Sequence, residues 1–132
     1  MFPLTARWTE REEVREQNVD EVADALSLFK EVDATSKDHP TMVEFENGHG
    51  ASIAIGAGRD VTVITAQHSL DPPYFTTRAK GATDGADAWF TYAGENTPYP
   101  GHSVVPKSDG IRALEHFLRT GELDPHVGWE RL

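Results

Sequence analysis

The chain has 132 residues and no cysteine, and its 22 acidic and 12 basic side chains give a formal net charge of −10. This length fits one domain over residues 1–132, whose core buries roughly two-thirds of the surface that the unfolded chain exposes. The lack of cysteine excludes disulfides and thiolate metal sites. The acidity argues against direct binding of nucleic acid, because such binding needs positive charge against phosphates.

The chain shows no membrane or export signal. No apolar run reaches the ~18 residues of a membrane helix, and the first residues lack the basic flank and apolar core of a secretory signal. We therefore expect a cytoplasmic protein that does not contact membranes. Its acidity suits a basic protein partner, and it is equally typical of proteins that need charge only for solubility.

The N-terminal segment predicts a strand followed by a helix. Leu4, Ala6 and Trp8 alternate with polar residues, which indicates a strand, and we expect it at a sheet edge. Asn18 with Glu21 three residues later fits the reciprocal cap of a helix start. The apolar stripe of this helix is Val22, Ala25, Leu26, Phe29 and Val32.

Short β-branched and aromatic segments after Pro40 are typical of an antiparallel meander, with turns at Asn47-Gly48 and at residues 58–60. The predicted strands are Thr41–Glu46, Ala51–Ile55, Val61–Ala66, Tyr74–Ala79 and Ala88–Ala93. The residues expected on one buried face are Val43, Phe45, Ile53, Ile55, Val61 and Val63.

The C-terminal third predicts two loops, Gly81–Asp87 and Glu95–Gly101, then a short strand at Val104 and Val105. Ser108 is the expected cap of a second helix that ends at Gly121. Its apolar face is Ile111, Leu114, Phe117 and Leu118. We predict an α+β fold: a curved, mostly antiparallel sheet of six to seven strands with two main helices packed on it.

Motifs for cofactors and catalysis are weak. Gly56-Ala57-Gly58 lacks the third glycine and the helix of a dinucleotide loop, and none of the six histidines forms an H-x-H or H-x-x-x-H pair. We therefore expect no cofactor, no metal and no enzyme activity. A small hydrolase would use His68 with Asp71 or Asp60, and its candidate nucleophiles are Ser69, Ser103, Thr76 and Thr77.

Aromatic and acidic residues near loops give the predicted binding surface. On one strand Trp89 and Thr91 share a face, and Phe90 and Tyr92 share the other. Trp129 is expected to seal the sheet. The residues predicted to bind a protein partner are Asp71, Tyr74, Asp84, Asp87, Trp89, Glu95 and Tyr99. An alternative is a small-ligand cavity in the curved sheet, lined by Phe75, Phe90 and Tyr92.

A series of short motifs runs through the C-terminal half in a fixed order. They are Tyr74–Thr77, Trp89–Gly94, Asn96–Pro98, Val104–Pro106, Ala113–Leu118, Thr120-Gly121 and Gly128–Glu130. In this order the chain resembles the first numbered family of bacterial polymorphic-toxin immunity proteins, which are often encoded beside toxins with nucleic-acid deaminase domains. The resemblance implies no enzyme activity. It implies a cognate toxin as partner, which we expect to be basic.

Overall fold

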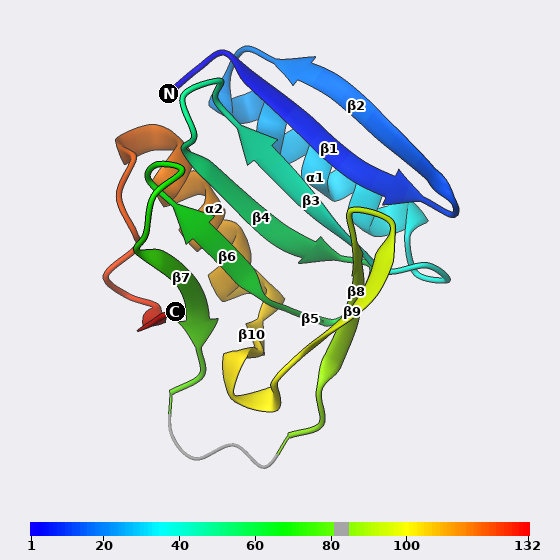
Figure 1. The fold of residues 1–132 in the computed structure, drawn as a ribbon. Helices are drawn as coiled ribbons and strands as arrows, with labels where there is room; N and C mark the ends of the chain where they lie inside the picture. Colours follow the sequence, from blue (N-terminus) through cyan, green and yellow to red (C-terminus); the bar gives the residue numbers. More distant parts are fainter. Residues whose placement is uncertain (81–84) are drawn as a thin grey trace.

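Two helices cover one face of a mainly antiparallel sheet (Figure 1). The computed structural model describes residues 1–80 and 85–132, to which all structural statements refer. Within them the elements are β1 Leu4–Glu10, β2 Glu13–Val19, α1 Val22–Thr35, β3 Thr41–Glu46, β4 Ser52–Ala57, β5 Val61–Thr62, β6 Ile64–Gln67, β7 Tyr74–Arg78, β8 Ala88–Tyr92, β9 Glu95–Tyr99, η1 Gly101–Ser103, β10 Val105–Pro106, α2 Lys107–Thr120 and β11 Gly128–Arg131.

Seven strands form the main path of the sheet in the order β11-β7-β6-β4-β3-β1-β2, and every pair along it is antiparallel. The β8–β9 hairpin joins β3 through one parallel contact, Thr41 with Thr91. The short strands β5 and β10 pair separately. The predicted α+β class, with an antiparallel sheet and two helices, is confirmed. The order departs from a simple meander because β3, which follows α1, pairs with β1 instead of β2.

The main core lies between the sheet and the helices. Ala25, Leu28, Phe29 and Val32 of α1 and Ala113, Leu114, Phe117 and Leu118 of α2 are buried there. Leu28 and Ala113 were not among the predicted stripes, and the predicted Val22, Leu26 and Ile111 are only partly buried. The sheet contributes alternate residues, including Val43, Phe45, Ile53, Ile55, Ile64 and Ala66. Each large side chain buried in this way stabilises the fold by about 1.5–3 kcal/mol. Trp129 also packs against this core, and its indole N–H donates to the Asp124 carbonyl.

A second, smaller core lies on the opposite face, under the β8–β9 hairpin. Phe90 is fully buried there beside Met42, Ala54, Val63 and Ala88. Its ring lies directly over the backbone of Gly56, where an added Cβ would come within 2.6 Å of two ring carbons. The hairpin is thereby held over one end of this face. The two helices lie on the other side of the sheet, so the rest of the face has no helix over it (Figure 1).

The N-terminal predictions need two corrections. β1 is not an edge strand, because β2 pairs along its full length and forms the edge. Asn18 does not cap α1, since it lies in β2 opposite Thr5. Glu21 occupies the cap position without a side-chain bond. The sequence signal for β2 is weak because Val19 is its one buried residue, as expected for a solvated edge strand.

The predicted strand Val61–Ala66 is split into β5 and β6. The Gly56 N–H donates to the Val63 carbonyl at this break, and the period of two shifts by one residue. Val63 therefore packs in the second core while Ile64 faces the helices, and Val61 is 37% exposed. The expected face was right for Val43, Phe45, Ile53 and Ile55, and wrong for Val61 and Val63.

Two further expectations fail in the C-terminal half. Residues 95–99 form β9 instead of a loop; Ala93 and Gly94, both at positive φ, make the tight turn that suits a hairpin. β9 tolerates Pro98 because it pairs only with β8. Ser108 lies inside α2, whose cap position is Pro106, whereas Gly121 ends the helix in the left-handed conformation as predicted.

Replacing Gly56 by alanine should weaken the docking of the hairpin. The new methyl group must displace the Phe90 ring, and such overpacking costs about 1–3 kcal/mol of unfolding free energy. Denaturant unfolding measures the loss. Gly48→Ala is the matched control, because a Cβ there meets nothing within 4 Å. Equal stability of the two variants would contradict the role given to this contact.

Candidate functional site

The β8–β9 hairpin brings together four of the residues predicted to bind a partner. Asp87 immediately precedes β8, Trp89 lies on β8, and Glu95 and Tyr99 begin and end β9. Asp87 and Glu95 are exposed, and the Trp89 side chain is 44% exposed. The predicted alternation is confirmed here, because Phe90 is buried on the other side of the strand.

The outer flank of the hairpin is braced by the rest of the protein. The Arg59 side chain donates to the Trp89 carbonyl at 2.8 Å, and its guanidinium lies 5.6 Å from the centre of the Phe90 ring. The Thr91 N–H donates to the Pro40 carbonyl at 2.9 Å. Trp89 therefore projects from a fixed backbone beside a concavity of about 520 Å³, lined by Asp38, His39, Pro40, Arg59, Trp89, Thr91 and Asn96.

Tyr99 supports the hairpin from within. Its ring meets the Phe90 ring edge to face, with centres 6.1 Å apart, and it borders the second core. Burial raises the pKa of Tyr99 to about 12, because ionisation would place a charge among apolar groups. The partly exposed part of this residue lies on the same hairpin as Trp89.

The remaining predicted residues lie elsewhere. Asp71 is exposed in the turn between β6 and β7, and its N–H donates to the Ser69 hydroxyl. Tyr74 begins β7 and donates to the Leu70 carbonyl. Strands β6 and β4 separate β7 from β3, which carries the hairpin. The predicted surface thus falls into two groups, and Asp84 lies outside the described residues.

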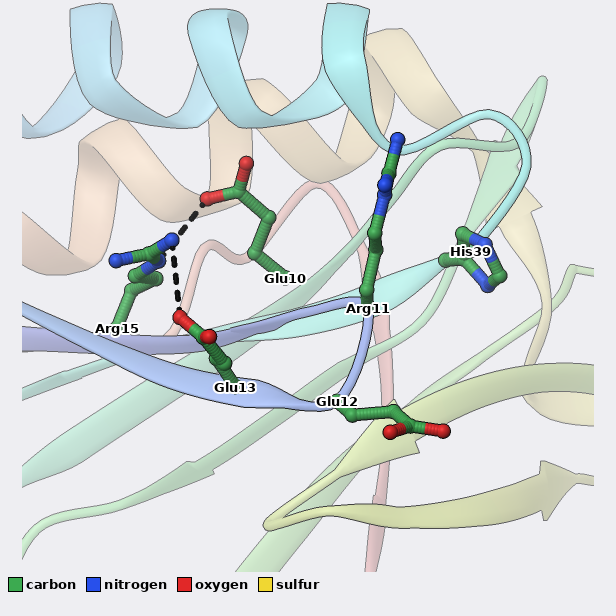
Figure 2. A pocket seen from close by; sticks show the side chains of 6 residues that line it. All are labelled: Glu10, Arg11, Glu12, Glu13, Arg15 and His39. Atoms are coloured by element: carbon green, nitrogen blue, oxygen red, sulfur yellow. Dashed lines mark hydrogen bonds and ion pairs between the residues drawn. The ribbon is translucent and has the colours of Figure 1, made fainter.

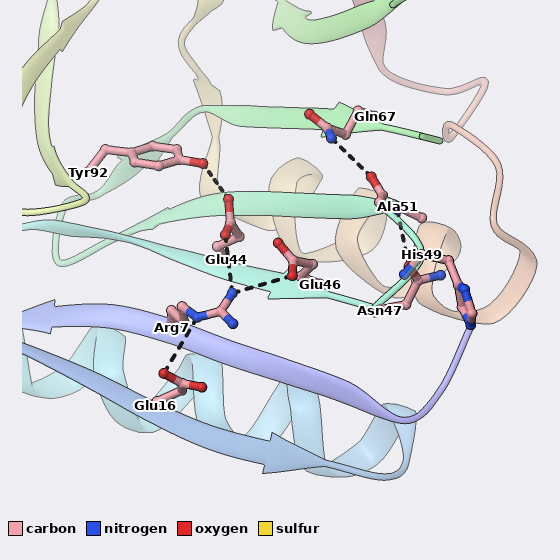
Figure 3. Close-up of polar contacts among 10 residues, drawn as sticks. Arg7, Glu16, Glu44, Glu46, Asn47, His49, Ala51, Gln67 and Tyr92 are labelled. Atoms are coloured by element: carbon pink, nitrogen blue, oxygen red, sulfur yellow. Dashed lines mark hydrogen bonds and ion pairs between the residues drawn. The ribbon is translucent and has the colours of Figure 1, made fainter. Parts of the chain in front are cut away.

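Strand register aligns polar side chains across the open face, meaning the part of the sheet that neither the helices nor the hairpin covers (Figure 3). One cross-strand row is Glu16, Arg7, Glu44, Ala54, Thr65 and Thr76, in which Ala54 is buried in the second core. The next row is Asn18, Thr5, Glu46, Ser52, Gln67 and Tyr74. Tyr74 therefore lies at one side of the open face, and the hairpin lies at the other side. In the sequence, Glu44 and Glu46 alternate with the buried Val43 and Phe45, which indicates that the two glutamates lie on this face. The predicted binding surface did not include them.

Three carboxylates on the open face share one arginine. Arg7 lies 3.6 Å from Glu16, 3.6 Å from Glu46 and 3.9 Å from Glu44. The Tyr92 hydroxyl donates to the other oxygen of Glu44 (Figure 3). Burial, and then this bond to Glu44, raise the pKa of Tyr92 well above its ordinary value, so the hydroxyl stays protonated. The open face next to the hairpin is consequently negative.

A concavity of about 680 Å³ lies at the β1–β2 turn (Figure 2). Its lining is Glu10, Arg11, Glu12, Glu13, Arg15 and His39. Arg15 pairs with Glu10 at 3.2 Å and with Glu13 at 3.1 Å. These pairs lie at the surface, where ion pairs contribute little energy.

The hydrolase alternative finds no support in the described residues. The His68 ring packs against Phe75 and Phe117, with centres 6.2 and 5.7 Å away, and it bonds to no carboxylate there. The Thr77 hydroxyl serves the backbone, donating to Ser103 at 2.7 Å and accepting from the Ile64 N–H. The one His–carboxylate pair among these residues joins His102 to Glu130 at 3.3 Å at the surface.

The predicted ligand cavity does not form either, because its three aromatic residues lie on different faces. Phe75 pairs with Ala66 of the main core, whereas Phe90 and Tyr92 belong to the second core. No group of three His, Asp or Glu residues in the described chain is placed to hold a metal ion. No helix in the described parts is long and apolar enough to cross a membrane.

Comparison with known proteins identifies the chain by its sequence. Residues 10–131 match the sequence model of a family described as Immunity protein Imm1. The match covers strands β2 to β11, including the hairpin, and both helices, while β1 lies outside it except for Glu10. No curated protein matches the chain.

The raised pKa of Tyr99 predicts a loss of stability in alkali. The folded state holds the proton up to about pH 12, while the unfolded chain releases it near pH 10, so the free energy of unfolding falls as the pH rises between these values. Tyr99→Phe should show a shallower fall in denaturant unfolding from pH 9 to 12. Tyr74→Phe is the control, because Tyr74 lies at the start of β7 and does not pack against the second core. The same slope in wild type and Tyr99→Phe would contradict the assignment.

Proposed function

The chain belongs to the Imm1 family of immunity proteins, and we propose that it binds its cognate toxin through the β8–β9 hairpin and the adjoining open face. Immunity proteins of this family neutralise toxins and are generally inhibitors without enzyme activity. The observation that carries the proposal is Trp89, which projects from a braced hairpin with 44% of its surface exposed.

Trp89 has the properties of a binding anchor. Among the described residues it is the one aromatic side chain in the set of strongly exposed large hydrophobic residues, the others being Met1, Val14, Val61, Leu70 and Leu132. Tryptophan is enriched where a few residues dominate binding energy. The bonds from Arg59 and to Pro40 fix the hairpin before the partner arrives, which lowers the entropic cost of association.

Charge favours a basic partner. Asp87 lies on the same side of the hairpin as Trp89, and Glu95 lies opposite Tyr92 on the other side. Glu16, Glu44 and Glu46 outnumber Arg7 on the open face. With a chain charge of −10, this surface would attract a positive cleft over long range and raise the association rate.

A cleft that binds nucleic acid carries such positive charge, which supports a nucleic-acid-acting toxin of the deaminase type. We propose that the hairpin and open face occlude this cleft in the cytoplasm. Inhibition then requires only slow release of the toxin. A standard interface of about 1,600 Å² supports nanomolar affinity, near −12 kcal/mol, when its anchors are well formed.

Trp89→Ala should weaken toxin binding roughly thirtyfold or more, because truncation of an anchor costs about 2 kcal/mol or more. The measurement is calorimetric titration with the toxin domain encoded by the neighbouring reading frame, together with growth protection on co-expression. Leu70→Ala is the matched control, since Leu70 is 74% exposed but lies at the β6–β7 turn. Equal losses, or a loss for Leu70→Ala alone, would move the interface away from the hairpin.

Reversing both hairpin acids, Asp87→Lys with Glu95→Lys, should slow association about tenfold at low salt and flatten its salt dependence. Stopped-flow mixing with the same toxin domain measures both effects. Asp24→Lys with Glu31→Lys changes the net charge equally on exposed positions of α1. If this control slowed association as much, the effect would belong to net charge instead of the hairpin.

A further inference from the structure

We infer that a groove between the hairpin tip and strands β1–β3 receives an arginine side chain of the partner. The groove has a volume of about 210 Å³ and is lined by Arg7, Trp8, Thr9, Val14, Met42, Glu44, Tyr92 and Ala93. This inference rests on the proposed function and names one contact within it. It places the partner on the inner flank of the hairpin, opposite to Trp89.

The groove combines apolar walls with one carboxylate. Val14 is 61% exposed at the rim, and Met42 extends the second core to the groove floor. Tyr92 and Ala93, at the end of β8 and in the hairpin turn, form the opposite wall. Such walls suit the aliphatic stem of a long side chain, while Glu44 suits the charge at its end.

Glu44 retains capacity for a further donor. One of its oxygens accepts from the Tyr92 hydroxyl, and the other lies 3.9 Å from Arg7, beyond hydrogen-bond range. The Arg7 nitrogens also lie 3.6 Å from the nearest oxygens of Glu16 and Glu46, which is too long for a hydrogen bond. An ionised carboxylate offers about four acceptor sites, so these contacts leave Glu44 under-used.

Charge balance selects a cation as the occupant. Arg7 and Glu44 line the groove, and Arg7 is shared with two more carboxylates beside it, Glu16 and Glu46. A second cation would bring the charge of this cluster closer to neutrality. The Glu44 side chain is 22% exposed, less than Glu16 at 59% and Glu46 at 39%, so a charge at Glu44 is the least screened by water.

Size and geometry favour arginine within this class. The groove is smaller than the ~300–1,000 Å³ of pockets that enclose whole small molecules, so it fits a single side chain. A guanidinium is planar, can bind a carboxylate through two N–H groups, and can stack on an aromatic ring such as Tyr92. A lysine ammonium lacks the paired donors and the stacking surface.

The groove can be tested without the toxin. Nα-acetyl-arginine amide, titrated into ¹⁵N-labelled protein, should shift the amide signals of Glu44, Tyr92 and Ala93 in a saturable way. Glu44→Gln should weaken this binding about tenfold or more, because a charge-assisted bond is lost while Tyr92 keeps an acceptor. Nα-acetyl-citrulline amide is the uncharged isostere. Equal binding of citrulline, tighter binding of the lysine analogue, or no shift at these residues would overturn the inference.

In the complex, Glu44→Gln should raise the Kd for the neighbouring-frame toxin domain about tenfold or more, chiefly through faster dissociation. Glu46→Gln is the matched control, because Glu46 contacts Arg7 but does not line the groove. If Trp89→Ala weakens binding while Glu44→Gln does not, the groove inference fails and the proposed function stands. If the wild-type protein does not bind the toxin domain, the proposed function fails, and the arginine titration still decides the groove.

Discussion

The contact of the Phe90 ring with the backbone of Gly56 is the constraint on which the proposed binding surface depends. Both helices pack on one face of the sheet, so the β8–β9 hairpin is the element that covers part of the other face. The hairpin is anchored there by one fully buried ring that requires a residue without Cβ beneath it. This contact sets how far the hairpin covers the face, and hence leaves the polar strand rows beside it open.

The same contact gives the hairpin two flanks of different character. Phe90 turns inward, so Trp89 must turn outward. On that side the Arg59 side chain donates to the Trp89 carbonyl, and the Pro40 carbonyl accepts from the Thr91 N–H. Tyr92 also turns inward, and its hydroxyl reaches Glu44 across the groove. The exposed Trp89 and the groove that contains Glu44 therefore lie on opposite sides of the hairpin. A concave partner surface can contact the hairpin on both sides.

The sequence predicted the fold class and most elements because their apolar periodicity is strong. It missed β2, where Val19 is the one buried residue, and β9, where Pro98 argues against a strand unless the strand is an edge. The face of Val63 could not be predicted, because a backbone bond from Gly56 shifts the period between β5 and β6. The hairpin residues were predicted as a partner surface because acids and aromatics cluster near the turns there, and their role in binding stays a prediction. The groove was missed because β1, β2, β3 and the hairpin each supply part of it, and only their pairing brings Arg7, Val14, Glu44 and Tyr92 together.

The excess of carboxylates over arginine on the open face also affects which partners can bind with high affinity. In the free protein, Glu16, Glu44 and Glu46 can share Arg7 at little cost, because water solvates what the arginine does not pair. A partner that covers the face removes this water, and an under-paired Glu44 then costs binding energy. A toxin that inserts a guanidinium avoids that cost, whereas a surface without a cation there must bear it. The groove would thus favour the cognate toxin mainly by penalising others, as specific interfaces do when they combine attraction with unpaired buried charge.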